Sequence, residues 1–320
     1  DMELYDYKPG SKSLIRPTEG TIASRLPPRI RIRKDAAIEL PHIMVLIDDA
    51  KNEVLSGLSS LAAKEDILYD GDLMMGGGRV TGCFVPAEKA SPVLAQSLSS
   101  LMRAGGKNNL LFAMGDGNHS LATAKAVWEG IKPALSPAQQ KTHPARHALV
   151  EIVNLYDPGI EFHPIHRILS GVNPEEFFAF LRKKPGFTLR QTADFAETEN
   201  LCRAENARGE NLFHAGILSQ KNKAVLSFEK KNAFLPTGII QSTLEEFQRG
   251  KIDYIHGRDS LFALSEREAA VGLLLPALPK EKLFSVVIQD GALPRKAFSI
   301  GEAPEKRFYL EGRRIDGIGG

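Results

Sequence analysis

One short stretch of the chain combines glycines with polar side chains that could bind and activate a ligand. It consists of Gly115, Asp116, Gly117, Asn118, His119 and Ser120. Glycines let a strand turn sharply into a helix, and the first amides of that helix then point outward without an intrahelical partner. Such a helix N-terminus attracts anions such as phosphate. We therefore expect the backbone N–H groups of Gly117, Asn118 and His119 to hold a phosphate.

The side chains of this turn suggest catalytic roles as well. His119 falls in the first turn of the helix, where the helix dipole favours a neutral imidazole that can serve as hydrogen-bond partner, base or ligand. The plain alternative is that Asp116 or Asn118 only caps the helix. Capping would explain one of these residues but not all of them, so the functional interpretation is favoured.

Residues elsewhere in the chain could complete such a site. Glu19 lies in a predicted turn and could act as general base or magnesium ligand, although a surface acid is the equal alternative. Asp72 is a candidate metal ligand or a simple cap. His166 and Arg167 together could contact an anion. Lys296, in a basic turn after a helix, could reach phosphate as a point charge or could be a solvated lysine.

Two further patterns carry charged residues. The run Pro41 to Asp49 is predicted to be a buried strand that delivers Asp48 and Asp49 to a loop. In residues 25–34, arginines alternate with Ile30 and Ile32, which predicts a half-buried strand with the arginines on one face. That face is either a solvated strand edge or an anion-binding surface.

The remaining elements follow from apolar periodicity and from turn and cap residues. Helices are predicted over 52–64, 91–103, 119–129, 173–186, 260–269 and 279–291, and strands over 110–114, 147–157, 162–169, 211–218, 223–230 and 269–276. Three glycines, 76–78, predict a hairpin turn better than a nucleotide motif. We expect an α/β or α+β fold with a mixed β-sheet and flanking helices, divided into domains 1–170 and 171–320.

Composition excludes several classes of protein. The chain has 41 basic and 39 acidic residues, so its net charge of +2 gives no whole-protein field that would attract nucleic acid. The longest run without charge is far shorter than a membrane span. Cys83 and Cys202 lack the spacing of a zinc ribbon or a disulfide framework. We expect a cytoplasmic protein with no membrane partner, and the sequence leaves the oligomeric state open.

Several segments, in order, resemble a prokaryotic family called domain of unknown function 1015. They are TEGT, PHIMVLIDD, LMMGGG, MGDGNHSLATAK, HPIHRIL, YIHG and LPRKAFSIGEAPEKRFYLE. The resemblance aligns Asp116 to Ser120 with an Asp-Gly-His-His-Arg motif, His166-Arg167 with a Thr-His-Arg triplet, and Lys296 with a lysine turn. Asn118 and Ser120 depart from that motif. The family's first segment has no counterpart here, so we expect the N-terminal part of the full-length protein to be absent.

The Asp-Gly-x-His turn also resembles the phosphate-binding loop of the ParB and sulfiredoxin superfamily, which includes a free-serine kinase that uses nucleotide. The resemblance implies a ParB/sulfiredoxin-like core. Sulfiredoxin chemistry requires a cysteine in this turn, where the chain has Asn118. ParB proteins bind DNA through a helix-turn-helix, of which the sequence has no sign, so nucleic acid is an unlikely partner.

We therefore expect a nucleotide- or phosphate-binding enzyme, such as a small-molecule phosphotransferase that uses ATP or ADP with Mg²⁺. Asp116 or Glu19 would orient magnesium or accept the proton of the acceptor hydroxyl, and Lys296 or the His166-Arg167 pair would neutralise developing charge. One alternative is a regulatory or ligand-sensing protein that keeps the anion pocket without catalysis. The other is a metal hydrolase built from Asp48, Asp49, Asp72, Asp116 and His119.

Overall fold

The computed structural model describes residues 1–62, 66–104, 110–209, 211–230, 235–294, 296–301 and 308–316. They form two compact units, which we describe separately. Unit 1 comprises Asp1–Glu161 and Ile300–Gly320, and unit 2 comprises Phe162–Ser299. The seam expected near residue 170 falls at the end of a strand of unit 2, and the last segment of the chain returns to unit 1.

Unit 1 is built on a mixed sheet. Its strands, in spatial order, are β1 (Ile15–Pro17), β6 (Phe112–Asp116), β3 (Met44–Ile47) and β7 (Glu151–Asn154). Strands β1 and β6 run parallel, as do β3 and β7, whereas β3 is antiparallel to β6. The carboxyl ends of β1 and β6 therefore share one edge of the sheet with the beginning of β3, and we call this the β1/β6 edge.

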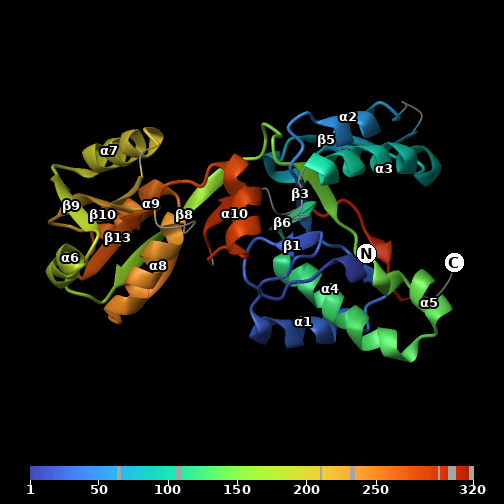
Figure 1. The fold of residues 1–320 in the computed structure, drawn as a ribbon, viewed down its shortest axis with the longest axis horizontal. Coiled ribbons are helices and arrows are strands. Elements are labelled where there is room, and N and C mark those ends of the chain that lie inside the picture. Colours follow the sequence, from blue (N-terminus) through green and yellow to red (C-terminus); the bar gives the residue numbers. More distant parts are fainter. Residues whose placement is uncertain are drawn as a thin grey trace. The chain divides into compact units, whose positions relative to one another are not determined.

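Two pairs of helices accompany this sheet, as Figure 1 shows: α1 lies along α4, and α2 lies along α3. The helices of unit 1 are α1 (Leu26–Arg33), α2 (Glu53–Ser59), α3 (Ala87–Ala104), α4 (Asn118–Ile131) and α5 (Pro137–Thr142). Its two-stranded sheets are β4 (Ile67–Asp72) with β5 (Arg79–Cys83), and β2 (Ile38–Glu39) with β15 (Arg313–Arg314). The β4–β5 hairpin confirms the turn predicted at residues 76–78.

The core of unit 1 joins the beginning of the chain to α4. Trp128 is fully buried, and its indole Nε1–H donates to Glu3 Oε1 over 2.6 Å. Around it lie buried apolar side chains from the N-terminal segment, β3, β6 and α4: Met2, Tyr5, Ile43, Val45, Met114, Leu121 and Ala124. These contacts fix the position of α4, and hence of the turn that precedes it.

A buried carboxylate joins four segments of unit 1. Glu39 accepts hydrogen bonds from the guanidinium groups of Arg33 and Arg313 and from the backbone N–H of Leu149. Burial alone would raise the pKa of Glu39, but the hydrogen bond from Arg313 and the charge of Arg33 outweigh it, so the pKa is lowered. The carboxylate is thus held ionised between α1, β2, β15 and the segment before β7.

Unit 2 is an antiparallel sheet covered on both faces. Its seven described strands are β12 (Lys251–His256), β8 (Phe162–Ser170), β13 (Ala270–Leu274), β10 (Leu212–Leu218), β11 (Lys223–Glu229) and β9 (Phe187–Thr192), with β14 (Phe298–Ile300) beside β8. Its described helices are α6 (Pro174–Lys183), α7 (Phe195–Ala207), α8 (Pro236–Phe247), α9 (Arg258–Ser265) and α10 (Leu283–Asp290). Figure 1 shows α7 on one side of this sheet, and α6 and α8 on the other. The mixed α/β class is confirmed.

The two faces of the sheet follow the alternation of its side chains. Leu273 contributes to the core beneath α6 and α8, whereas Leu274 packs with Leu261 of α9. On this second face Gly216 and Gly272 let the helices approach closely, because an added Cβ would lie 3.0 Å from Thr198 of α7 or from Ser265 of α9. Helix α6 and strands β8, β10, β11 and β13 confirm the elements predicted for this part of the chain, whereas α7, α8, β9 and β12 were not predicted.

Strand β8 carries a buried polar pair. Arg167 is fully buried, and its Nη1 donates to the carbonyl oxygens of Ile165 (2.6 Å) and Lys296 (3.0 Å). Its guanidinium lies 4.5 Å from the ring centroid of Tyr254. The neighbouring His166 accepts a hydrogen bond from the backbone N–H of Leu275 at Nδ1. Burial, followed by the charge of Arg167, lowers the pKa of His166 to about 4.

Two predicted elements were wrong. Residues 26–33 form helix α1 and not a strand. In a helix, Leu26 can be buried while Arg33 contacts Glu39, and these contacts with the rest of unit 1 favour the helix. A proline in the first turn is compatible with this helix. Helix α3 begins at Ala87 and not at Ser91, so it contains Pro92 and loses the hydrogen bond that a residue there would donate.

We expect Glu39→Gln to lower the free energy of unfolding of unit 1 by about 3 kcal/mol, because two partly buried arginines lose the buried carboxylate that neutralises them. Chemical denaturation measures this change. Asp70→Asn is the matched control, since Asp70 pairs with Arg79 on the surface of the β4–β5 hairpin, and it should change stability far less. Equal effects of the two substitutions would contradict a structural role for the buried cluster.

The stability of unit 2 should depend on pH through His166. The folded state resists protonation down to about pH 4, whereas an unfolded histidine binds a proton below about pH 6.5. Stability is therefore complete above pH 6.5 and falls as pH drops toward 4, with a slope of up to about 1.4 kcal/mol per pH unit. His166→Gln should remove this slope in denaturation measured from pH 8 to 4. The free energy of unfolding at pH 8, where His166 is neutral in both states, measures the effect of the substitution itself. An unchanged slope in the variant would show that His166 does not cause the pH dependence.

Candidate functional site

The turn from β6 into α4 depends on Gly117. This residue has φ of +82° and is the N-cap of α4. A Cβ added here would lie 2.5 Å from the carbonyl oxygen of His42 and 2.9 Å from Ile43 Cα. Only glycine accepts both the left-handed backbone and this close approach. The start of β3 therefore determines where α4 begins.

The N-cap residue of α4 is Gly117, which makes no side-chain capping hydrogen bond. Neither Asp116 nor Asn118 is the N-cap, which corrects the plain alternative considered above. Instead Asp116 Oδ1 accepts the N–H of Gly117 over 2.7 Å, so this amide is not part of the expected phosphate cradle. The first helical hydrogen bond runs from Leu121 N to Gly117 O. The cradle consequently shifts to the first turn of α4, where Ser120 is exposed to solvent.

Two buried polar atoms near this turn have no hydrogen-bond partner. Asn118 is only 9% exposed, and its Oδ1 is unsatisfied. Thr21 Oγ1 is unsatisfied as well. A buried polar atom without a partner costs on the order of 1–3 kcal/mol, so such atoms are uncommon outside sites that a ligand or water completes. Together with the anion-binding tendency of a helix N-terminus, they make the start of α4 a candidate ligand site.

The segment after β1 reaches the same edge. Thr18 Oγ1 donates to the carbonyl of Met114 over 2.5 Å, and the backbone N–H of Ile22 donates to His119 Nε2 over 3.2 Å. Because Nε2 accepts, a neutral His119 carries its proton on Nδ1. Glu19 lies between these two contacts in the sequence and is half-buried. The structure thus brings the Glu19 segment to the β6–α4 turn, as the site requires.

Three candidate aspartates lie elsewhere. Asp48 and Asp49 follow β3, which is antiparallel to β6, so they belong to the opposite edge of the sheet from Asp116. Asp49 is buried and accepts the N–H of Val54 at the start of α2, and Asp48 accepts the hydroxyl of Tyr156. Asp72 is exposed in the β4–β5 hairpin, beside Arg79. The proposed five-residue metal cluster is therefore not formed.

Metal-ligating side chains do not gather anywhere in the described ranges: no group of three or more His, Cys, Asp or Glu there could hold a metal ion. At the β1/β6 edge the candidate side chains carry oxygen atoms. Glu19 and Asp116 supply carboxylates, and Asn118 supplies an unsatisfied amide oxygen. These are the donors that Mg²⁺ prefers when a nucleotide completes its coordination.

The remaining candidates belong to unit 2. His166 and Arg167 are buried in β8, and Arg167 holds the backbone of Lys296 through its carbonyl. Lys296 itself is exposed and has φ of +56°. Arg167 therefore supports the backbone of the basic turn from within unit 2, and the side chain of Lys296 is exposed there.

Sequence analysis did not identify Thr21, Ile22 or His42. Each acts across a long separation: Ile22 contacts a residue 97 positions away, and the carbonyl of His42 covers Gly117. No local pattern marks a backbone amide or carbonyl for such a role. The only signal was indirect, since Thr18 to Thr21 is one of the segments that resemble the family.

No described helix of either unit has the length and apolar character needed to cross a bilayer. Among curated proteins none matches the chain. Solved structures with a similar fold include a point mutant of free serine kinase in complex with ADP, at 12% identity and a TM-score of 0.49, covering 97% of this chain and 92% of that one. Another mutant complex, with AMP, has the same identity and TM-score and covers 97% and 95%.

A conserved hypothetical protein from Pyrococcus furiosus is similar at 11% identity and a TM-score of 0.47, covering 97% of this chain and 95% of that one. The family described as protein of unknown function, DUF1015, matches residues 1–250. This match covers well over half of the sequence and confirms the resemblance noted in its motifs. The chain belongs to the DUF1015 family.

Proposed function

We propose that this protein binds a nucleotide through its phosphates at the N-terminus of α4 and transfers a phosphoryl group to a small molecule. The observation that carries the proposal is the uncapped start of α4 next to the buried, unpartnered Oδ1 of Asn118. Uncapped amides and the positive end of the helix dipole favour an anion. The Oδ1 atom requires a donor or a hydrated cation, which a nucleotide with its magnesium brings.

The geometry of the turn supports binding without rearrangement. Gly117 is held in its left-handed conformation against His42, and α4 is anchored by the fully buried Trp128. The amides are therefore oriented before the ligand arrives, and preorganised dipoles stabilise a transferring phosphoryl group more strongly than mobile ones. Ser120 is exposed, so the turn is open to solvent.

The chain's own carboxylates would serve the chemistry. Glu19 and Asp116 are the acids brought to the β1/β6 edge, and with Asn118 they would hold the magnesium that a nucleotide carries. When bound, this ion neutralises phosphate charge. One carboxylate would accept the proton of the acceptor hydroxyl as its oxygen bonds to phosphorus, while the bond to the nucleotide oxygen breaks. His119, with Nε2 occupied by Ile22, would have a positioning role.

One observation favours a second candidate, a ligand-sensing protein that binds nucleotide without turnover. The turn 115–120 contains no arginine or lysine, because Ser120 stands where the family motif has arginine. A phosphoryl-transfer site usually supplies a cation to the transferring group. Binding without transfer in the presence of small hydroxylated acceptors would favour this candidate.

The wider setting of the proposal follows from the sequence. The Asp-Gly-x-His turn supports a core of the ParB/sulfiredoxin type for unit 1. A bacterial, cytoplasmic enzyme with a small-molecule acceptor fits the cysteine usage and the balanced charge. Neither nucleic acid nor membrane is required as a partner.

Thermal denaturation with ATP, ADP, AMP, GTP and inorganic phosphate, each with and without Mg²⁺, tests the proposal. A ligand at about one hundred times its Kd should stabilise the native state by about 2.7 kcal/mol. We expect a rise with nucleotides that magnesium increases. A panel without any shift, for protein shown to be folded, would refute nucleotide binding.

The variant Asn118→Leu separates ligand binding from folding. It removes an unsatisfied buried oxygen and keeps the number of side-chain heavy atoms, so the ligand-free protein should be about as stable as the native one. The nucleotide-induced rise in Tm should be lost. Ser136→Ala is the matched control, because it removes the side-chain cap of α5 and should cost about 1 kcal/mol while the nucleotide effect persists. If nucleotide raised the Tm of Asn118→Leu as much as that of the native protein, the nucleotide would not bind at Asn118.

Gly117→Ala tests the backbone constraint. Its Cβ would meet the His42 carbonyl and its φ is unfavourable, so we expect a loss of at least about 2 kcal/mol of stability and of nucleotide binding. Gly130→Ala in the same helix is the control. Its Cβ has no neighbour within 4 Å, so it should stabilise α4 by about 0.5–1 kcal/mol and leave binding intact. If Gly117→Ala and Gly130→Ala had equal stability and equal nucleotide binding, the left-handed backbone of Gly117 would not be required at this turn.

A further inference from the structure

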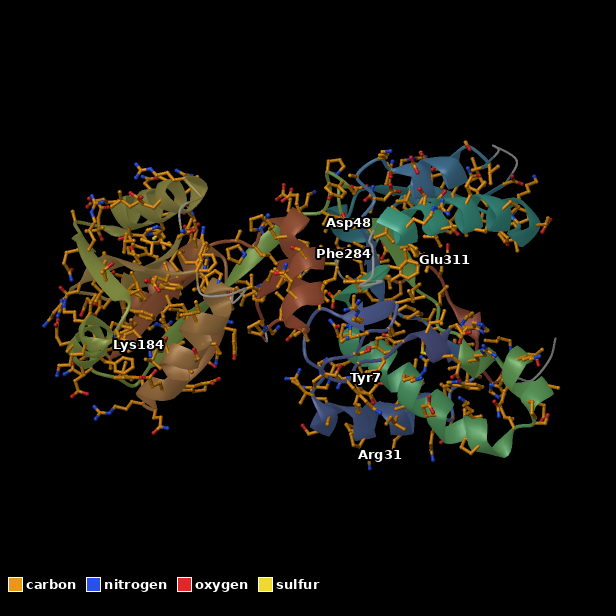
Figure 2. The ribbon with its side chains drawn as sticks, in the orientation of Figure 1. Tyr7, Arg31, Asp48, Lys184, Phe284 and Glu311 are labelled. Atoms are coloured by element: carbon orange, nitrogen blue, oxygen red, sulfur yellow. The ribbon has the colours of Figure 1, made fainter. Side chains whose placement is uncertain are left out.

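Helix α1 distributes its arginines differently from the strand that the sequence suggested. Arg33 turns inward to the buried carboxylate of Glu39. Arg25, Arg29 and Arg31 are exposed. Figure 2 shows Arg31 on the side of α1 that faces away from α4. The opposite side is anchored by Leu26, which is only 7% exposed. The helix is thus a fixed platform with cations on its outer face.

These exposed cations have no acidic partner. In the ranges that the structure describes, no ion pair involves Arg25, Arg29 or Arg31, and Arg29 Nη1 donates to the backbone carbonyl of Arg25. The first acid in sequence is Asp35, beyond the end of the helix, where it pairs with Lys34. The outer face therefore offers guanidinium donors that the rest of unit 1 does not use.

Two of these charges, on Arg25 and Arg29, are also unfavourable to the helix itself. Arg25 is the N-cap, where the helix dipole disfavours a cation. Arg25 and Arg29 are four residues apart, a spacing that brings like charges together and destabilises a helix. Local stability therefore does not account for these arginines. An external anion would relieve both repulsions.

An exposed apolar side chain lies among the arginines. Ile32 is 77% exposed, and helical spacing places it on the same face as Arg25 and Arg29, seven and three residues before it. Pro27 and Pro28 are exposed as well. Arginine beside an apolar anchor is typical of the centre of protein interfaces.

We propose that the face of α1 that carries Arg25, Arg29 and Ile32 binds an acidic segment of a partner protein, whose carboxylates pair with Arg25 and Arg29 and whose apolar side chain covers Ile32. Guanidinium groups bind carboxylates in a bidentate manner, which suits this partner. A phosphate backbone would leave Ile32 without a contact. A membrane surface requires more apolar area than one isoleucine provides. The proposal is independent of the nucleotide site.

Fluorescence anisotropy tests the proposal with a labelled peptide of glutamates that contains two central leucines. The double variant Arg25→Glu/Arg29→Glu should weaken binding by at least about tenfold, because attraction becomes repulsion. These reversals favour the helix dipole, so Tm should not fall. Arg208→Glu/Arg258→Glu is the matched control, with the same change in net charge at exposed arginines that already have acidic partners, and it should retain binding.

Ile32→Ser separates the apolar contact from the charges. It should weaken binding of the leucine-containing peptide by about fivefold and leave binding of an all-glutamate peptide unchanged. Three results would overturn the proposal: no peptide binding at low salt, full binding by the Arg25/Arg29 double variant, or tighter binding of an oligonucleotide or of phosphatidylserine vesicles through the same arginines. The last result would assign the face to a polyanion of another class.

Discussion

The left-handed backbone of Gly117 beneath the carbonyl of His42 is the constraint on which the candidate site depends. It allows β6 to enter α4 without a connecting loop, and it directs the first amides of α4 away from the sheet. Asp116 then accepts the Gly117 amide, so the amides proposed to bind an anion begin one residue later than the glycine pattern indicates. One backbone conformation thus determines both the position and the composition of the site.

Strand direction decides which residues accompany this turn. The parallel pair β1 and β6 brings the segment from Thr18 to Ile22 to the same edge, where it contacts Met114 and His119. The antiparallel strand β3 sends its aspartates to the opposite edge, where Asp49 supports α2. Acidic residues that look equivalent in the sequence consequently have different surroundings: Glu19 and Asp116 lie at the candidate site, whereas Asp49 supports α2.

The arginines of this chain fall into two groups, those that bind partners within the fold and those that are exposed on α1. Arg33 and Arg313 neutralise the buried Glu39, and Arg167 serves carbonyl oxygens in the interior of unit 2. Buried arginines of this kind stabilise only when their donors are satisfied. The arginines on the outer face of α1 have no such partner in the described structure. The contrast identifies a surface suited to another molecule, which the nearly balanced net charge of the chain does not reveal.

Local sequence patterns correctly predict the mixed α/β class, the family, the helix that Asn173 caps, the β10–β11 hairpin and the glycine turn before α4. These features depend on neighbouring residues, through backbone preferences and capping hydrogen bonds. Only the tertiary structure decided that residues 26–33 are helical, that Asp49 supports α2, and that Ile22 reaches His119. Each of these results depends on contacts between segments far apart in the chain, where burial and strand direction outweigh local periodicity.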